Sequence, residues 1–359
     1  MAKKKKEKKE LAEFDITKPE QLLLFELGDY PAERQLSNSI AFYDAVPRYV
    51  WGKSDRQAGK FLDSIERDFE VSGKKYQVTI RPARVPDTDG VEKDHFPGAR
   101  EEFVEDALRR ITCEGSGLFL DAEMGSVFTL YQIREELKRM GRTYSINQIR
   151  QALEVCAGTQ LKITRVDENE DEYTMTFPMF ETLVLHSKKE HEQRGRIDAR
   201  GFVRFNPLVT KSIMKKTFRL YHYEKAMQLG HDTLARYLLK RLCRVYTFAA
   251  ESKPYSVFLT TLYSDSGMQF TTIREMKQRV EKSLKELIGK EVLSHFEMEP
   301  VKEGRSIHNW RLILYPHKKF VSLSIYANRR QQQVRADLIE QDRKETISKQ
   351  IQEIKSRFR

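Results

Sequence analysis

Two segments of the sequence combine a helix-capping pattern with polar side chains that can hydrogen-bond the edges of nucleic-acid bases. The first is SINQIRQALEVCAG, residues 145–158, in which Ser145 and Gln148 have the spacing of a capping box. One face of the expected helix is apolar, from Ile146 to Cys156. Asn and Gln can pair with adenine through two hydrogen bonds, and Arg can bind guanine or phosphate. The candidate contacts are Ser145, Asn147, Gln148, Arg150 and Gln151, of which Ser145 is expected to cap the helix.

The second segment, TIREMKQRVEKSLKELIG at residues 272–289, repeats this organisation. Thr272 and Glu275 again have capping-box spacing, and an apolar stripe runs from Ile273 to Leu287. We expect the first turns of the outward face to reach base edges and the later lysines to contact phosphates. The candidate contacts are Thr271, Thr272, Arg274, Glu275, Gln278, Arg279 and Lys282, followed by Lys285.

Both segments occupy the same place in an order of elements that recurs after about 130 residues. A first helix, which in the first copy is capped at Thr129 and ends at Gly141, precedes each segment, and a hairpin follows it. These are the elements of a winged helix, whose second helix fits the major groove of duplex DNA. The sequence therefore predicts an α+β fold with two tandem winged-helix domains. The hairpin strands are expected at 161–164 and 173–177 in the first copy and at 293–296 and 310–314 in the second.

The rest of the chain is expected to flank these two domains. Residues 1–20 are predicted to be a disordered basic tail, because a Lys/Glu tract buries too little apolar surface to offset the entropy of ordering it. A long amphipathic helix is expected at 233–249. The predicted layout continues with an N-terminal extension at 21–98, the first winged-helix domain at 99–205, the second at 206–327 and a basic C-terminal helix at 328–359.

The formal net charge of +11 favours a polyanionic partner, because Lys and Arg at phosphates release condensed counterions. Charge alone fits DNA and RNA equally well, and much of the excess lies in the two tails. Polar outward faces also occur on ordinary surface helices of soluble proteins. The double occurrence of capped helix, turn, capped helix and hairpin favours duplex-DNA binding over that alternative.

Several classes of protein are disfavoured. No apolar run is long enough for a membrane span, and MAKKKKEKKE is followed by no apolar signal-peptide core, so we expect a protein inside the cell. The chain has no GxxxxGKS/T, GxGxxG or GxSxG motif, which disfavours an enzyme and a nucleotide cofactor. Cys113, Cys156 and Cys243 stand far apart and are expected to be reduced thiols of the core.

Three other groups of polar residues favour a structural role over a metal or catalytic site. His186 and His191 could share a metal, but no third ligand stands near them in the sequence. His222 is flanked by tyrosines instead of a second histidine, which favours core or interface aromatics. The acidic residues that could hold a metal for nucleic-acid cleavage fall in the turn of the first hairpin, where a solvated tip is expected. They are Glu168, Glu170, Asp171 and Glu172.

Four segments make the chain resemble plasmid replication initiators of the TrfA/RepA type. They are SNSIAFYDAVPRY at 37–49, IRPAR at 80–84, FTLYQIREEL at 128–137 and VRFNPLV at 203–209. The resemblance implies tandem winged helices that bind repeated sequences, called iterons, at a plasmid origin. It further implies opening of an adjacent AT-rich stretch, recruitment of the host initiator and replicative helicase, and a homodimer that is inactive or autorepressing. Our hypothesis is that the aromatic segment 218–223 lies at the junction of the two domains and forms the dimer contact.

A short motif in the N-terminal extension is similar to the peptide with which such initiators engage the sliding clamp. Its residues are Gln21, Leu22, Leu24 and Phe25, and Leu23 departs from the Ser or Asp that the family more often has. Leu and Phe would fill an apolar groove of the clamp. A run of three leucines suits a strand or helix of the body equally well. For the whole chain, a winged-helix transcriptional autorepressor without origin-melting activity is the alternative function.

Overall fold

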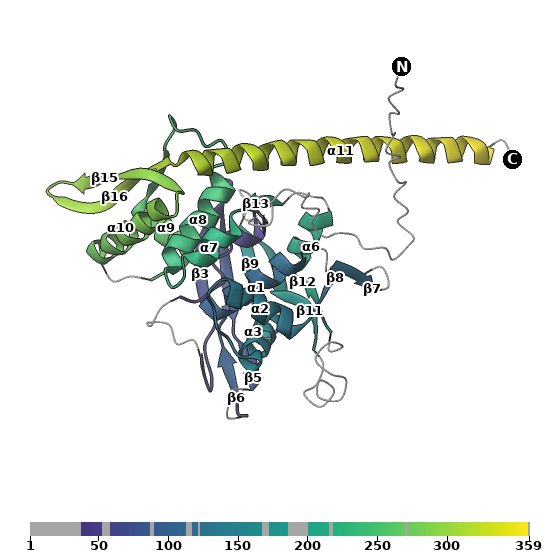
Figure 1. Ribbon diagram of the computed structural model, residues 1–359, viewed down its shortest axis with the longest axis horizontal. Coiled ribbons are helices and arrows are strands. Elements are labelled where there is room, and N and C mark those ends of the chain that lie inside the picture. Colours follow the sequence, from purple (N-terminus) through teal and green to yellow (C-terminus); the bar gives the residue numbers. More distant parts are fainter. Residues whose placement is uncertain are drawn as a thin grey trace, which may run out of the picture.

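The computed structural model describes residues 37–51, 58–86, 90–112, 117–120, 123–166, 172–185, 200–214, 218–269 and 272–357. Helices and small antiparallel sheets alternate along these residues (Figure 1). Within the described part of the chain, all strand pairings are antiparallel. The α+β class predicted from the sequence is therefore confirmed.

A first unit carries the first capping-box segment. α2 (Leu130–Arg139) begins at its predicted cap, where Thr129 Oγ1 accepts a hydrogen bond from the Gln132 N–H at 3.1 Å. Gly141, with a φ of 77°, forms the turn that leads to α3 (Ile146–Gly158). The other elements are α1 (Ala99–Ile111), β7 (Gly117–Leu120), β8 (Glu123–Phe128), β9 (Gln160–Val166), β10 (Glu172–Pro178), β11 (Phe180–Val184) and β12 (Gly201–Phe205).

A second unit repeats the order of two helices and a hairpin. α9 (Leu259–Ser266) and α10 (Ile273–Gly289) are joined through Gly267, with a φ of 69°, and the hairpin of β15 and β16 follows. The remaining bounds are α6 (Pro207–Met214), β13 (Arg219–Tyr221), α7 (Tyr223–Gln228), α8 (Thr233–Val245), β14 (Tyr255–Phe258), β15 (Leu293–Glu303) and β16 (Ser306–Pro316). Strand β16 lies between β14 and β15 in one sheet.

The long helix predicted at 233–249 is shorter in the structure. α8 ends at Val245, because Tyr246 leaves the helical region with φ −93° and ψ 57°. The chain turns there so that the Thr247 carbonyl can accept hydrogen bonds from Arg219 at 3.4 Å and Asn328 at 2.7 Å. The prediction was therefore wrong about the last turn of this helix.

The segment before α1 is built into both units. β1 (Ser37–Ser39) pairs with β13, and β3 (Ile65–Val71) and β4 (Lys74–Arg81) extend the β9–β10 hairpin into a sheet of order β10-β9-β4-β3. The division of the chain at 98, 205 and 327 stays a prediction, although contacts described here cross each of those positions. The segment also contains η2 (Tyr43–Ala45), β2 (Ala58–Gly59), β5 (Ala83–Pro86) and β6 (Glu92–His95).

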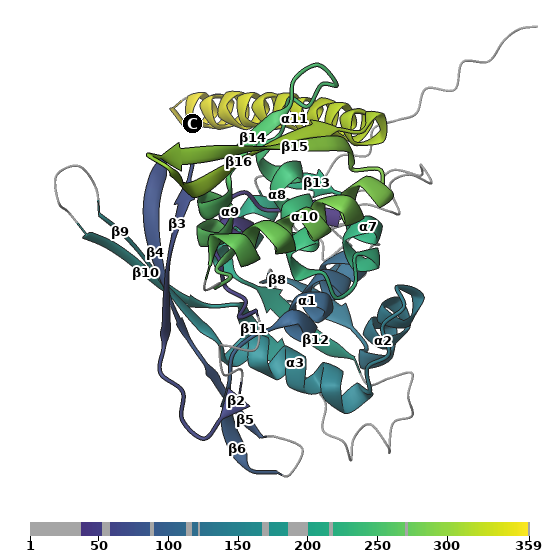
Figure 2. The same ribbon diagram turned by 90° about the vertical axis from the view of Figure 1, so that its left-hand side faces the viewer.

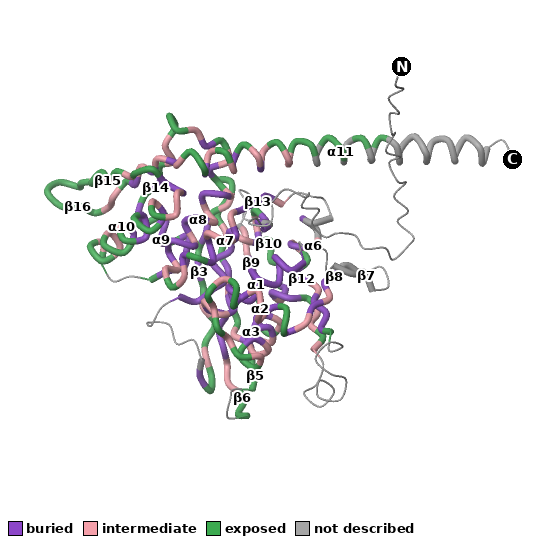
Figure 3. Tube along the Cα trace, in the orientation of Figure 1, coloured by how far each residue is buried: buried purple, intermediate pink, exposed green. Residues whose placement is uncertain are grey.

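One apolar core runs through both units. Its buried side chains extend from Ile40 before α1 to Phe320 beyond the second hairpin. Figure 3 shows that burial concentrates where α1, α8 and β13 meet and that the β15–β16 hairpin and the tip at β6 are exposed. The two units are therefore joined by packed apolar surface.

Ion pairs buried between α1 and α8 accompany this core. The Glu102 carboxylate binds the Arg236 guanidinium and accepts from Lys240 Nζ at 2.9 Å, and Lys240 also donates to Asp106 at 2.6 Å. Burial by itself would raise the pKa of Glu102, but Arg236 and Lys240 lower it to about 2. Phe103 lies between two guanidinium groups, with Arg236 Cζ 4.2 Å and Arg142 Cζ 4.3 Å from its ring centroid.

A second set of ion pairs ties the segment before β2 to α1. Arg48 binds Glu105 at 3.2 Å and Asp44 at 3.3 Å, and Arg109 binds Asp44 at 2.9 Å. Tyr49 donates its hydroxyl proton to Glu105. We refer to these two sets together as the buried charge cluster. Its members are Asp44, Arg48, Glu102, Glu105, Asp106, Arg109, Arg236 and Lys240.

A 40-residue helix, α11 (Lys318–Arg357), ends the described chain. Its first turns are anchored to the second unit, because Phe320 and Ala327 are buried and Arg219 donates to Asn328 Oδ1 at 2.8 Å. Farther along, the helix leaves the body and extends beyond it (Figure 1), and in Figure 2 it lies across the top of the molecule.

Replacing Arg236 with Met tests the buried charge cluster. Arg236→Met should lower the free energy of unfolding by about 3–5 kcal/mol, because it leaves the Glu102 carboxylate buried beside Lys240 alone. Lys285→Met, on the exposed face of α10, is the matched control and should change the free energy of unfolding by less than about 0.5 kcal/mol. Urea unfolding at pH 7 measures both. Equal midpoints for Arg236→Met and the wild type would contradict the role assigned to this pair.

Candidate nucleic-acid interface

Helix α10 is held in place by its cap and by its buried face. Thr272 Oγ1 accepts from the Glu275 N–H at 3.2 Å, as the capping pattern predicted. On the buried face, Ser283 Oγ donates to Asp232 Oδ1 at 2.8 Å. Asp232 also caps α8, where it accepts from the Ala235 N–H at 3.0 Å. One carboxylate thus fixes α10 against α8, and the opposite face of α10 is turned outward.

The outward face of α10 has the composition that the sequence predicted. Its positive side chains are spread over the first four turns, and the acidic residues Glu275, Glu281 and Glu286 lie among them. Thr271 lies outside the described residues. The predicted contacts that are exposed are Thr272, Arg274, Glu275, Gln278, Arg279 and Lys282, followed by Lys285, whose Nζ lies 3.7 Å from Glu281.

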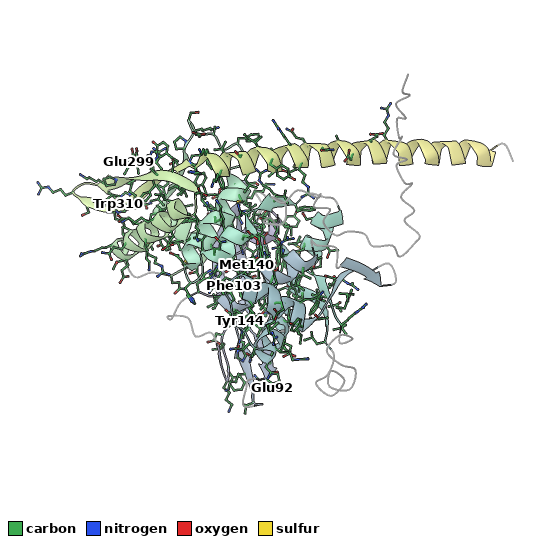
Figure 4. The ribbon with its side chains drawn as sticks, viewed as in Figure 1. Glu92, Phe103, Met140, Tyr144, Glu299 and Trp310 are labelled. Atoms are coloured by element: carbon green, nitrogen blue, oxygen red, sulfur yellow. The ribbon has the colours of Figure 1, made fainter. Side chains whose placement is uncertain are left out.

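The β15–β16 hairpin is fixed beside α10. Lys277 Nζ lies 4.3 Å from the centroid of the Trp310 ring, which joins the helix to β16. Asn309 Nδ2 donates to Thr260 Oγ1 at 2.8 Å, which joins the same strand to α9. Figure 4 labels Trp310 on the hairpin at the edge of the molecule, away from Phe103 in the interior. No spacing in the sequence indicated the contact between Lys277 and Trp310, because it joins helix α10 to the second strand of the hairpin, 33 positions farther along.

Helix α3 begins with the predicted capping box. Ser145 Oγ accepts from the Gln148 N–H at 3.2 Å, and Gln148 Oε1 accepts from the Ser145 N–H at 2.8 Å. The carbonyl end of the Gln148 amide is therefore used within the helix. Asn147, between them in sequence, is exposed.

The next turn of α3 differs from the expectation of an open polar face. Gln151 is half-buried: its Oε1 accepts from Arg100 at 2.9 Å, and its Nε2 donates to the Pro86 carbonyl at 3.3 Å. Arg150 is also half-buried and interacts electrostatically with Glu154. Gln151 therefore has structural partners on α1 and β5, and its assignment as a base contact stays a prediction.

Strand β5 is the reason for this difference. Ala83 and Val85 pack against Val155, on a side of α3 away from its main apolar stripe. Gly158 permits the close approach, since a Cβ there would lie 2.8 Å from the Ala83 Cβ. Val155 was the one sequence signal for a second buried side, because it is apolar where a purely polar face was expected.

Helices α10 and α3 lie on the same side of the molecule. Figure 2 shows both facing the viewer, with α10 above α3, and the β15–β16 and β9–β10 hairpins reaching outward toward the same edge. A polar helix face beside a projecting hairpin is therefore present twice on this side, and the face of α10 is the more exposed and the more positive of the two.

The aromatic segment 218–223 does not form the exposed contact that we hypothesised. Leu220, Tyr221 and Tyr223 are buried, and Tyr221 lies opposite Ser37 in the β1–β13 pair. Burial, together with the charge of Lys225, lowers the pKa of His222 to about 4, so this histidine is neutral at pH 7. The segment is interior structure, as the interpretation of His222 predicted.

Other predicted groups are placed as follows. Cys156 and Cys243 are buried free thiols, as expected. In the part of the chain that the structure describes, His, Cys, Asp and Glu side chains form no group of three that could hold a metal ion. No helix of that part is long and apolar enough to cross a membrane. Outside the described residues lie Gln21, Leu22, Leu24, Phe25, Cys113, Glu168, Glu170, Asp171, His186 and His191.

Comparison with known proteins gave matches among solved structures alone: no family model and no curated protein matches the chain. A selenomethionine derivative of domains 2 and 3 of RctB matches with a TM-score of 0.49 and 10% identity, over 77% of this chain and 98% of that one. A second RctB structure, also of domains 2-3, gives 0.44 and 11%, over 76% and 96%. The Pi initiator protein in complex with iteron DNA gives 0.39 and 11%, over 67% and 98%.

A pair of variants on α3 tests the role assigned to Gln151. Gln151→Ala should lower the free energy of unfolding by about 1–2 kcal/mol, because Arg100 and the Pro86 carbonyl lose their partner. Asn147→Ala, one turn earlier and exposed, should change it by less than about 0.5 kcal/mol. Chemical denaturation compares the two. If Asn147→Ala proved the more destabilising, the structural role of Gln151 would be refuted.

Proposed function

We propose that the chain binds duplex DNA through two tandem winged-helix modules. The first consists of α2, α3 and the β9–β10 hairpin, and the second of α9, α10 and the β15–β16 hairpin. In each, the second helix would enter the major groove and the hairpin would contact the backbone. The observation that best supports this proposal is that the N-terminal half of α10 is exposed and that the contact of Lys277 with Trp310 holds the hairpin beside it.

The chemistry of α10 suits sequence recognition as well as attraction to DNA. Gln278 can pair with adenine, and Arg274 and Arg279 can bind guanine through two parallel hydrogen bonds. Lys282 and Lys285, one and two turns farther on, are placed for phosphates. The net charge of +11 adds a sequence-independent attraction that weakens as salt rises.

The two modules contribute unequally in this proposal. On α3 the candidates Ser145, Asn147 and Gln148 are exposed, but Ser145 and Gln148 form the capping box and Gln151 contacts β5. The first module would therefore contribute few base contacts, and the second would supply most of the discrimination between sequences. The buried charge cluster and the shared core support both modules binding as one rigid unit.

The biological role that we propose is initiation of plasmid replication at an origin with repeated binding sites. Support for the role comes from the four sequence segments that resemble plasmid initiators, at 37–49, 80–84, 128–137 and 203–209. The chain would act inside the cell, open the neighbouring duplex and recruit the host initiator, the helicase and the sliding clamp. We propose no catalytic step, since the sequence has none of the phosphate-loop or nucleophile motifs sought above.

Two alanine variants of α10 test the proposed base contacts. Gln278→Ala and Arg279→Ala should each weaken binding to the cognate repeat by about 1–3 kcal/mol, with little loss on scrambled DNA. Lys285→Ala is the matched control on the same face and should weaken both complexes equally, lowering the salt slope by about 1. Fluorescence anisotropy across a salt series measures all three. Equal losses on both DNAs for Gln278→Ala and Arg279→Ala would show that they contact no bases.

Origin opening separates an initiator from an autorepressor. The protein is added to a supercoiled plasmid that carries the repeats and an AT-rich stretch, and unpaired thymines are mapped with permanganate. An initiator should make the AT-rich stretch reactive, and deletion of the repeats should abolish that reactivity. Tight binding to the repeats without any unpaired thymines would favour the autorepressor and contradict the proposed role.

A further inference from the structure

A small cavity lies where α8 meets the segment before β2. Its volume is about 40 Å³, which exceeds the space that one water molecule needs. Four of the side chains that line it are cationic and two are anionic, so its wall carries an excess of positive charge. These six are Arg48, Lys240, Arg241, Arg244, Asp44 and Glu102.

Three of the four cations have carboxylate partners. Arg48 and Lys240 belong to the buried charge cluster. Arg241 binds Asp265 at 2.6 Å and donates to the hydroxyl of Tyr237 at 3.0 Å. The positive charges of these residues are thus matched by neighbours in the fold.

Arg244 is the exception. Its Nη1 donates to the backbone carbonyl of Asp44, and no carboxylate of the described residues lies within 4.0 Å of its guanidinium. Burial lowers the pKa of Arg244 and Arg241 lowers it further, whereas the more distant charges of Asp44 and Asp265 offset only part of this shift. A guanidinium has five N–H donors in a planar fork, which leaves donors beyond the Asp44 carbonyl for a ligand.

We propose that this cavity binds a small inorganic oxyanion, such as phosphate, with Arg244 as its main ligand. Planar guanidinium donors match the oxygens of an oxyanion, and the charge of the anion would balance the excess on the cavity wall. Lys240 and Arg48 reach the same cavity and add to the attraction. The site lies between α8 and a segment that is tied to α1, so its occupant stabilises the junction of the two modules.

Trp51 lines the cavity and reports on its occupancy. The sequence has two tryptophans, so Trp310→Phe leaves Trp51 as the sole indole fluorophore. Sodium phosphate is titrated into this variant at constant ionic strength, with chloride as the replaced anion. We expect a saturable change in Trp51 emission and, at ten times the midpoint concentration, a melting temperature raised by about 2 °C. A change in Trp51 emission that never saturates would overturn the proposal and indicate that water alone occupies the cavity.

Two substitutions assign the effect to Arg244. Arg244→Gln in the same background should abolish the saturable change in emission and the gain in melting temperature. Arg81→Gln is the matched control, because Arg81 is exposed on β4, and it should keep both. An unchanged phosphate response in Arg244→Gln would refute the site. If Arg244→Gln does not fold, Arg244→Lys decides instead: weaker saturable binding supports the proposal, and wild-type affinity overturns it. No DNA is present, so the outcome is independent of the proposed function.

Discussion

The attraction between an acidic side of α1 and a basic side of α8 is the contact on which the arrangement of the molecule depends. Glu102 and Asp106 meet Arg236 and Lys240 at positions shielded from water. Removing charges from water costs free energy, and each carboxylate recovers that cost only while its partner stays in place. Opposed charges of this kind tolerate little sliding of one helix along the other, because a shift of one turn would separate every pair.

From this junction the positions of both exposed helices follow. Asp232 caps α8 and also binds Ser283, so the orientation of α8 is passed directly to α10. On the other side, Glu101 of α1 accepts from Arg100, which in turn donates to Gln151 on α3. The distance and angle between the two candidate recognition helices are thus set by polar contacts that lead back to α1 and α8, in addition to the apolar core.

Local patterns were sufficient to predict the two helix pairs and the hairpins that follow them, whereas contacts between residues distant in the sequence could not be predicted. The caps at Thr129, Ser145 and Thr272 depend on residues three positions apart, and each was found where the sequence placed it. The pairing of β4 with β9 joins strands about 80 residues apart, and no periodicity encodes such a partner. The polar face of α3 was overestimated for the same reason, because β5, which covers part of it, comes from the segment expected to stand apart.

Helix α11 gives the molecule a long reach. At 1.5 Å per residue its 40 residues span about 60 Å, roughly twice the diameter of a small domain. The hydrogen bond from Arg219 to Asn328 holds the first part of α11, so the axis of the helix is fixed relative to the body at that point. The C-terminal end of α11 is consequently held away from the body, at a distance that side chains on the body cannot bridge. A group bound near Arg357 would be kept apart from the surface formed by α10 and α3, because the intervening helix is stiff.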